Sequence, residues 1–377
     1  MNIYLDNAAT TKPYPEVIEE MLPYQEADFG NASSINKLGI RSAKAIEKAR
    51  LIISKAINAN PEEIFFSSGG TESNNSAIIG IAFANKKKGN HIITSAIEHP
   101  SIHEVTKWIE TQGFEVTYLP VDREGFINPH DVEKAIEKKT VLVSIMQANN
   151  EIGTIEPIFE IGKICKEKEV YFHSDACQSL TKTELDVRKQ YLDIVTLNAH
   201  KIHGPKGVGA IFIKKGTNIN PLLHGGGQEN NFRSGTYNTP GIVGFGKAVE
   251  ISNQTDVKEM IYLRDYFIQR IRDNIEDVLV NGPEGEKRLS NNINLIFENV
   301  NGKSLFLELN KKDIFISTGS ACSSAELTPS RVLIAIGHNP ETANGAIRIS
   351  TSKFTTKEEL DLVVENIIDI VKKERGK

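Results

Sequence analysis

The sequence predicts an α/β protein with a large domain, built on a mixed, mostly parallel sheet, and a small α/β domain. Three observations support this prediction. Short β-rich runs alternate with helical patterns through the first two thirds of the chain. Residues 141–146 are apolar except for Ser144, as in a strand that is buried on both faces. After about residue 245 the regular alternation of strand and helix patterns ends, and a long helical pattern begins.

The elements of the large domain follow one another in a regular order. A β-rich run at 63–67 leads through Gly69-Gly70 into a helical pattern. We predict strands at 63–67, 91–95, 114–119, 141–146, 170–174 and 194–197, and helices at 71–85, 101–112, 129–138 and 158–168. A hairpin-like stretch at 207–213 follows the last of these strands.

The second part of the chain has fewer strands. We predict a helix at 246–276, two short strands around a turn near 281–283, a strand at 292–297, a helix at 304–310, a strand at 348–350 and an amphipathic helix at 357–372. The predicted large domain therefore covers residues 14–250, and the small domain covers 1–13 and 251–377.

Composition excludes several classes of protein. The chain has 377 residues, and its 44 basic and 49 acidic side chains give a net charge of −5, which favours neither nucleic acid nor an anionic membrane surface. No apolar run approaches the roughly 20 residues that span a bilayer, and the N-terminus lacks the pattern of a signal peptide. Three widely spaced cysteines, without a C-x-x-C pair, exclude a disulfide framework and a cysteine-rich zinc site and indicate a reducing cytoplasm. No H-E-x-x-H pattern indicates a metal.

Three segments carry residues suited to chemistry. The strand–turn–helix junction at 67–73 offers free N–H groups and a helix dipole to an anion, although a simple glycine turn with a helix cap would look the same. Asp175 follows an apolar strand, where it is either a helix cap or a ligand carboxylate. Lys201 follows another strand at the same sheet edge, where partial desolvation would lower its pKa and make it an imine-forming nucleophile.

Together these segments meet the demands of one cofactor. Pyridoxal phosphate needs an anion cradle, a Schiff-base lysine and a carboxylate that keeps its pyridine nitrogen protonated. No other constellation in the sequence is as complete.

A fourth segment carries a cysteine in an unusual setting. Eight of the ten residues 316–325 are small or hydroxylic, which predicts a mobile loop, and Cys322 lies within it. Because cysteines are normally buried, this position indicates a reactive thiol, although a chance free thiol is the alternative.

These residues belong to a longer set of motifs that the chain shares with a known family. The chain resembles the class V, aminotransferase-like pyridoxal phosphate enzymes, and among them the cysteine desulfurases of the nitrogen-fixation and iron–sulfur-cluster type. The resemblance implies fold type I for the whole chain. The motifs lie at 4–11, 30–34, 69–74, 98–100, 149–153, 174–178, 200–207, 224–229, 233–236, 320–322 and 347–350.

The resemblance implies a role for each matching cofactor residue. Lys201 would form the Schiff base, Asp175 would pair with the pyridinium, Gln178 would bind the phenolic oxygen, and His99 would stack on the ring and transfer protons. The residues implied in phosphate binding are Gly70, Thr71, His200 and, acting across a subunit interface, Thr236.

Two positions depart from the family pattern. Asn198 stands where the family usually has a phosphate-contacting serine, and Cys177 stands where it often has threonine. Asn198 can still donate a hydrogen bond, but its side chain is longer.

The resemblance also implies the substrate and the reaction. Asn150 and Arg348 would bind the carboxylate of L-cysteine, Lys201 would remove the α-proton, and Cys322 would take the sulfur as a persulfide and leave alanine. A homodimer and an acceptor such as an iron–sulfur scaffold protein are implied as partners. The alternatives are a selenocysteine lyase, another class V aminotransferase, which would not need Cys322, and, remotely, a non-enzymatic sulfur relay.

Overall fold

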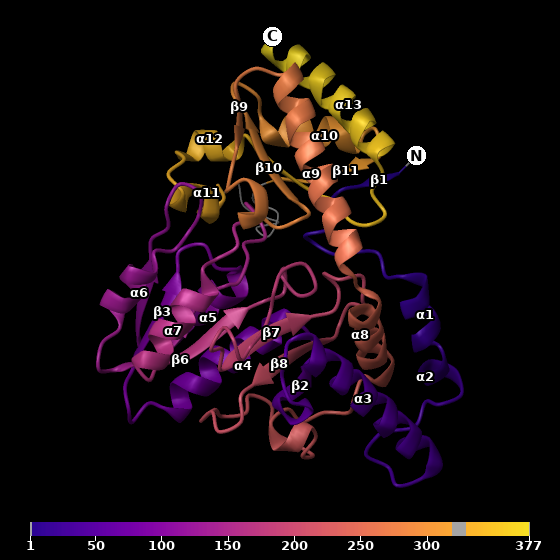
Figure 1. Ribbon diagram of the computed structural model, residues 1–377, viewed down its shortest axis with the longest axis vertical. Helices are drawn as coiled ribbons and strands as arrows, with labels where there is room; N and C mark the ends of the chain where they lie inside the picture. Colours follow the sequence, from indigo (N-terminus) through magenta and orange to yellow (C-terminus); the bar gives the residue numbers. More distant parts are fainter. Residues whose placement is uncertain (1, 319–328, 377) are drawn as a thin grey trace.

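The structure is a computed structural model that describes residues 2–318 and 329–376 (Figure 1). Its central sheet has the strand order β2-β8-β7-β6-β5-β3-β4. The strands from β7 to β4 are parallel, whereas β8 is antiparallel to both β7 and β2. The mixed, mostly parallel sheet of the prediction is therefore confirmed. The strands are β2 (Ile64–Ser67), β3 (His91–Ser95), β4 (Glu115–Leu119), β5 (Thr140–Ser144), β6 (Tyr171–Asp175), β7 (Ile194–Asn198) and β8 (Gly209–Ile213).

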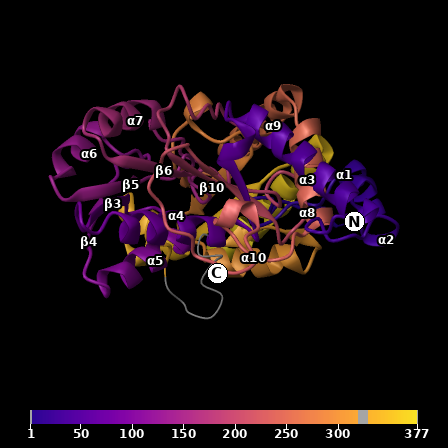
Figure 2. The ribbon, with the colours of Figure 1, turned by 90° about the horizontal axis from the view of Figure 1, so that it is seen from below.

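Helices cover both faces of this sheet, which explains why its inner strands are apolar on both sides. Leu142 and Ile194 pack under α4 and α5, whereas their neighbours Val143 and Val195 pack under α3, α7 and α8 on the opposite face. Figure 2 shows α6 and α7 on one side of the strands and α4 and α5 on the other. The helices of this part are α1 (Pro15–Met21), α2 (Pro23–Glu26), α3 (Lys37–Ala56), α4 (Gly70–Ala84), α5 (Pro100–Glu110), α6 (Pro129–Ala135), α7 (Ile158–Glu167) and α8 (Thr239–Ile251).

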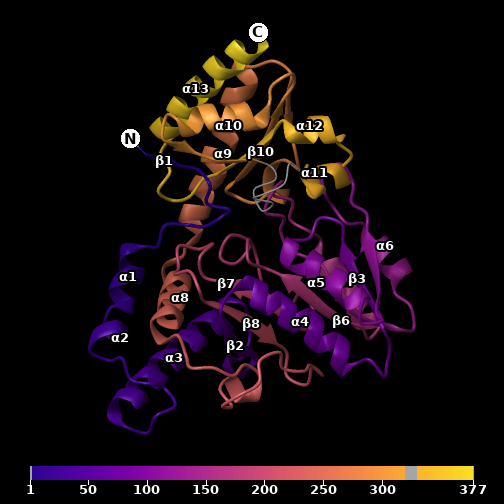
Figure 3. The ribbon, with the colours of Figure 1, turned by 180° about the vertical axis from the view of Figure 1, so that it is seen from behind.

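A second core forms around a four-stranded antiparallel sheet with the order β12-β13-β10-β9. Helices α9, α10 and α13 pack on it, and Ile3 and Leu5 from the N-terminus belong to the same core (Figure 3). The elements are β1 (Ile3–Tyr4), which pairs with β11 (Ile314–Phe315), α9 (Gln254–Asn274), β9 (Val278–Val280), β10 (Asn292–Phe297), α10 (Gly302–Asn310), β12 (Ser317–Thr318), α11 (Arg331–Ala335), α12 (Pro340–Asn344), β13 (Ala346–Ser350) and α13 (Lys357–Arg375).

The structure corrects two predicted elements. The single helix expected at 246–276 is two helices, because Ser252 is extended and the Asn253 side chain caps α9 by accepting from the N–H groups of Thr255 and Asp256. Only one of the two short strands expected around the turn at 281–283 is present. β9 precedes the turn, but a 3₁₀ turn at Gly285–Lys287 follows it.

The two cores suggest how the chain divides. Helix α8 packs in the core of the large sheet and α9 in the second core, so we retain the division into 14–250 and 1–13 with 251–377 as a proposal. None of the helices in the described residues combines the length and apolarity needed to cross a membrane.

A buried ion pair fixes the segment that follows β8. The Arg50 guanidinium donates to both carboxylate oxygens of Glu229 at 2.9 and 2.7 Å, and Glu229 also accepts from the Phe66 N–H at 2.6 Å. Arg50 and Glu229 are only 8% and 4% exposed. The pair therefore joins α3, β2 and the turn at Glu229–Asn231.

We expect Arg50→Met to lower the free energy of unfolding by about 3–5 kcal/mol, because it leaves the Glu229 carboxylate buried without its cation. Urea unfolding followed by circular dichroism measures the change. The matched control is Arg41→Met, which breaks an exposed pair with Asp28 and should cost less than about 1 kcal/mol. Equal losses for the two variants would contradict the structural importance of the buried pair.

Candidate active site

The carboxyl ends of β6 and β7 bring the predicted cofactor residues to one edge of the sheet. Asp175 ends β6, and Asn198 ends β7 beside it. The Asp175 carboxylate accepts hydrogen bonds from the Asn74 side chain at 2.7 Å and from the Cys177 N–H at 2.9 Å. Asp175 and Asn198 are 6% and 4% exposed. Two donors therefore hold a buried carboxylate at the edge where α/β sheets bind their ligands.

An open pocket of about 420 Å³ lies where α4 begins. Gly69 has φ 151°, a conformation open to glycine, and a Cβ on Gly70 would lie 2.7 Å from the Cys177 sulfur. Gly69 is therefore needed for the turn, and Gly70 allows the start of α4 to approach Cys177 closely. The N–H groups of the first helical turn are available to an anion. The pocket lining includes Thr10, Ser68, Gly70, Thr71, His200 and Lys206.

His200 enters this pocket as a neutral ring. Burial, followed by the charge of the neighbouring Lys201, lowers the pKa of His200 to about 4, and its Nδ1 lies 3.1 Å from the Thr10 hydroxyl. The pocket therefore offers backbone N–H groups, hydroxyls, a neutral imidazole and the Lys206 ammonium, which are donors suited to a phosphate.

Lys201 and Gln178 meet at a single backbone carbonyl. The Lys201 ammonium donates to the carbonyl oxygens of Ala8 and Ala9, and the Gln178 amide donates to the same Ala8 oxygen at 2.9 Å. Among the described residues, neither the Gln178 Oε1 nor the Asn198 Oδ1 has a hydrogen-bond partner, although both are buried. Such unpartnered atoms are costly unless a ligand or water satisfies them.

These observations fit pyridoxal phosphate. The site joins an amine, a donor-stabilised carboxylate and an anion cradle. The sequence predicted Gly70, Thr71, Asp175, Gln178, Asn198, His200 and Lys201 as cofactor residues, and each lies at this sheet edge or in this pocket.

The predicted substrate residues are in direct contact. Arg348 lies on β13, is 3% exposed, and donates to the backbone oxygen of Asn150 at 3.2 Å. Its guanidinium also forms an ion pair with Asp6 at 2.7 Å, and its Nε is buried without a partner among the described residues. A substrate carboxylate at Arg348 would therefore share the guanidinium with Asp6.

The roles of two predicted residues stay predictions. Thr236 is exposed and lies outside the described lining of the phosphate pocket, so its role across an interface stays a prediction. Cys322 lies outside the described residues, as does the segment 319–328 around it.

Sequence reasoning missed three residues of the site. Lys206 lines the phosphate pocket, although the motif at 200–207 that contains it indicates no role for this lysine. Asp6 pairs with Arg348 from 342 positions away in the chain. Lys182 donates to the Gln178 carbonyl at 3.0 Å, and burial followed by the charge of Lys201 lowers its pKa to about 7.

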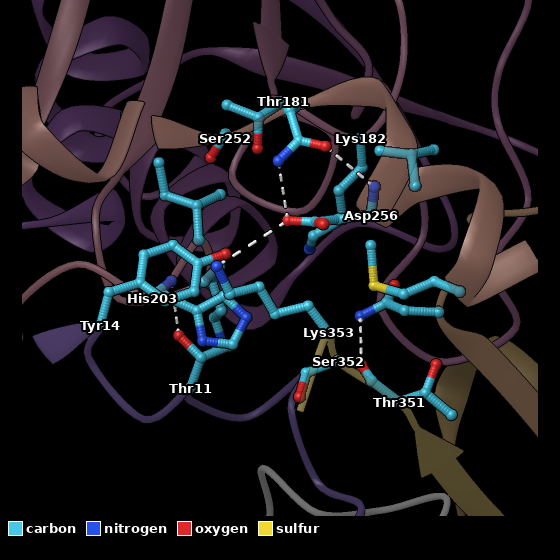
Figure 4. A pocket seen from close by; sticks show the side chains of 16 residues that line it. Thr11, Tyr14, Thr181, Lys182, His203, Ser252, Asp256, Thr351, Ser352 and Lys353 are labelled. Atoms are coloured by element: carbon cyan, nitrogen blue, oxygen red, sulfur yellow. Dashed lines mark hydrogen bonds and ion pairs between the residues drawn. The ribbon is translucent and has the colours of Figure 1, made fainter. Parts of the chain in front are cut away.

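Lys182 and Lys201 also line a second pocket, of about 30 Å³ (Figure 4). Figure 4 shows side chains from both parts of the chain around it, among them Tyr14, Asp256 and Lys353. This volume suits one or two water molecules and is too small for a cofactor.

Cys177 is a packing residue in this arrangement. It is 8% exposed, and burial together with the nearby Asp175 carboxylate raises the pKa of its thiol well above the usual value. Since the thiolate is the nucleophilic form, Cys177 is poorly suited to take sulfur from a substrate.

Glu98, next to His99, is a buried acid. Its Oε1 accepts from the Ser95 hydroxyl at 2.7 Å and from the Met146 N–H at 2.9 Å, and its Oε2 has no partner among the described residues. Burial raises the pKa of Glu98 from 4.5 to about 8. The folded chain therefore keeps a proton on Glu98 that the unfolded chain releases above about pH 4.5.

Between about pH 5 and pH 8.5, the free energy of unfolding should fall as the pH rises, because the unfolded chain releases the Glu98 proton first. We expect Glu98→Gln to make this fall smaller by on the order of a few kcal/mol. The stabilising contribution of the raised pKa is complete below pH 4.5 and disappears as the pH rises through about 8. Urea unfolding across this range gives the slope, with the exposed Glu62→Gln as control. A slope identical to that of the unmodified protein would contradict a protonated Glu98.

Comparisons with known proteins give the same assignment as this geometry. The family model described as Aminotransferase class-V matches residues 3–363. The chain is 50% identical over 377 residues to "Cysteine desulfurase IscS" of Clostridium botulinum strain Hall, covering 99% of this chain and 95% of the relative. It is 51% identical over 376 residues to "Cysteine desulfurase IscS" of Dictyoglomus turgidum, with the same coverages.

Solved structures agree in fold. A structure titled "NIFS-LIKE PROTEIN" superposes with a TM-score of 0.92 at 38% identity, covering 98% of this chain and 99% of the other. A structure titled "SspA in complex with cysteine" gives a TM-score of 0.85 at 37% identity, covering 94% of this chain and 100% of the other. The predicted fold type and the predicted family are both confirmed.

Proposed function

Because this chain belongs to the aminotransferase class V family, as a pyridoxal phosphate-dependent cysteine desulfurase, we propose that Lys201 and His99 carry its proton transfers and that Cys322 receives the sulfur of L-cysteine. The observation that carries the proposal for Cys322 is where its segment starts and ends. Ser317 on β12 pairs with Arg348, and Ser330, after the segment, bonds to the Glu151 carboxylate. Both ends are therefore fixed beside the residues proposed to hold the substrate carboxylate.

Chain length supports the same proposal. Cys322 follows Thr318 by four residues, which span at most about 14 Å, and Thr318 pairs with Ile347, the neighbour of Arg348. Chain length therefore allows the Cys322 thiol to reach a substrate bound at Arg348, which supports the proposal.

The residues then have separate tasks. Asp175, Gln178, His200, Thr71 and the first turn of α4 would hold the cofactor, which when bound supplies a sink for the electron pair left at the substrate α-carbon. Arg348 and the Asn150 side chain would orient the substrate carboxylate, and Lys201 would take the α-proton at Nζ.

Sulfur transfer is a displacement at the substrate sulfur. The Cys322 thiolate forms an S–S bond to that sulfur while the C–S bond breaks, and the electron pair of the broken bond stays with the three-carbon fragment. Protonation of that fragment gives alanine, and Cys322 is left as a persulfide that an acceptor thiol can reduce.

A product assay tests this function. We expect L-cysteine with a thiol reductant to give alanine and sulfide in equal amounts, without any 2-oxo acid. A selenocysteine lyase would act on selenocysteine and leave cysteine unchanged. Amino-group transfer to added 2-oxo acids, without sulfide, would instead indicate an aminotransferase.

We expect Arg348→Ala to raise the KM for L-cysteine by on the order of 10-fold to 100-fold, since a charged hydrogen bond contributes about 1.5–3 kcal/mol, and to change kcat less. Steady-state alanine formation measures both constants. The matched control is Arg272→Ala, which removes an exposed guanidinium of the same part of the chain, paired with Glu284. Unaltered kinetics in Arg348→Ala would mean that another group holds the carboxylate.

The proposed partners follow from the surface and the chemistry. Helices α1 to α3 are grouped on one flank in Figure 1, and the segment between α2 and α3 exposes two large apolar side chains, Phe29 at 69% and Ile35 at 96%. We assign this surface to a second copy of the chain, which would also bring Thr236 to the partner's phosphate pocket. The thiol that becomes the persulfide must stay reduced between turnovers, so we place the protein in a reducing cytoplasm. Its sulfur acceptor would be an iron–sulfur scaffold or another thiol protein.

A further inference from the structure

Two side chains without an assigned role, Asn74 and Ser101, connect His99 to Asp175. The Asn74 amide nitrogen donates to the Asp175 carboxylate at 2.7 Å and to the Ser101 hydroxyl oxygen at 2.8 Å. The Ser101 hydroxyl lies 2.8 Å from His99 Nδ1. Asn74, Ser101 and Asp175 are 1%, 8% and 6% exposed. A continuous buried chain of hydrogen bonds therefore runs from β6 through α4 to the first turn of α5.

The backbone N–H of Ser101 determines which nitrogen of His99 carries the proton. His99 is the N-cap of α5, and its Nδ1 accepts from the Ser101 backbone N–H at 3.1 Å. A backbone N–H can only donate, so Nδ1 carries no proton, and the proton of a neutral ring is on Nε2.

The Asn74 amide is oriented by the carboxylate that it faces. Its nitrogen must point to Asp175, even though its Oδ1 is then buried without a partner among the described residues. Since the Ser101 oxygen accepts from Asn74, the Ser101 hydroxyl is free to donate its own proton to His99 Nδ1.

We propose that Ser101 and Asn74 are positioning residues that keep His99 neutral, with its single proton on Nε2, so that the ring exchanges protons through that atom alone. The inference rests on the proposed function, because it concerns the way His99 would serve that site. A second proton on Nδ1 would face the Ser101 N–H and would have to displace the Ser101 hydroxyl proton, so two donors oppose the imidazolium form.

The charges around the ring act in both directions. Burial lowers the pKa of His99, the Asp175 carboxylate opposes this effect, and the cationic Lys201 and Arg331 add to it. The two donors from Ser101 thus act together with burial and the cations against the pull of Asp175.

The test is a histidine titration by ¹⁵N NMR on the full-length holoenzyme labelled with ¹⁵N-histidine, with the His99 signals identified by their loss in His99→Gln. In the unmodified protein we expect an unprotonated Nδ1 and a protonated Nε2 from about pH 8 down to about pH 6. Ser101→Ala removes one of the two donors to Nδ1 and should raise the midpoint of the His99 titration by about one pH unit. Ser101→Thr keeps the hydroxyl and should restore the original midpoint.

Thr106→Val is the matched control, because it removes a buried hydroxyl from the same helix that bonds to the backbone oxygens of Ile102 and His103. It should leave the His99 midpoint unchanged. If Ser101→Ala does not fold, Asn74→Ala replaces it and should give a shift in the same direction, since Ser101 then loses the donor that orients its hydroxyl.

Two results would overturn the inference. One is a proton on Nδ1 in the unmodified protein, and the other is a Ser101→Ala titration that superimposes on that of the unmodified protein. Alanine formation measured on the same samples separates this inference from the proposed function. If the titration is as expected but the protein makes no alanine, the proposed function is overturned, and the positioning of His99 by Ser101 and Asn74 still holds.

Discussion

Lys201→Ala is expected to abolish the covalent attachment of pyridoxal phosphate. It should also lower the rate of alanine formation by about 10²-fold to 10⁴-fold, which is the usual contribution of a positioned general base. Lys201 is the amine held at the carbonyl oxygens of Ala8 and Ala9, beside Gln178 and at the sheet edge where Asp175 ends β6. An alanine there removes both the imine-forming nitrogen and the group proposed to take the α-proton.

Visible absorption before and after borohydride reduction measures the attachment, followed by mass analysis of the peptide that carries the cofactor. Lys182→Ala is the matched control, since Lys182 is another amine that lines the small pocket with Lys201. We expect Lys182→Ala to keep the reducible chromophore. A reducible chromophore that persists in Lys201→Ala would contradict the lysine assignment.

Cys322→Ala is expected to reduce alanine and sulfide formation from L-cysteine to the level of Lys201→Ala, while the cofactor remains attached. The proposed reaction needs a thiolate to take the sulfur, and no other cysteine is suited to this role. Burial raises the pKa of both Cys165 and Cys177, so neither provides a thiolate at neutral pH.

Cys177→Ala is the control for this prediction. It removes a thiol close to the cofactor residues without removing the proposed sulfur acceptor, and it should retain most of the alanine formation. If Cys322→Ala kept full activity and Cys177→Ala lost it, the assignment of the two thiols would have to be exchanged.

The sequence was sufficient to predict the central sheet and most of the site, because both depend on local signals. Val143 and Val195 lie in short apolar runs that indicate strands buried on both faces, and Asp175 and Lys201 follow such runs directly. Parallel strands place these ends at one edge, so residues 26 positions apart in the sequence could be assigned to one site.

Other features depend on contacts that no local pattern records. The ion pair between Asp6 and Arg348 joins the two ends of the chain, and β1 is only two residues long and pairs with β11. The Asn74–Ser101 contact requires α4 and α5 to lie side by side. These pairings become visible only when the tertiary structure is known.

The single helix expected at 246–276 was wrong, although the sequence contains a signal for the break. The break between α8 and α9 lies within a continuous helical pattern of apolar residues, but Asn253, followed three residues later by Asp256, is a typical helix start. By contrast, helices α1 to α3 precede the first predicted strand and were not predicted, although α3 alone has 20 residues.

The role of Cys322 as sulfur acceptor is decided by where the sulfur of L-cysteine goes in a single turnover. The holoenzyme is mixed with less than one equivalent of ³⁵S-labelled L-cysteine without reductant, and the peptides are separated after alkylation. We predict one added labelled sulfur atom on the peptide that carries Cys322, with alanine formed in the same amount. Label on Cys177 or Cys165, or alanine formed without any labelled peptide, would contradict the account.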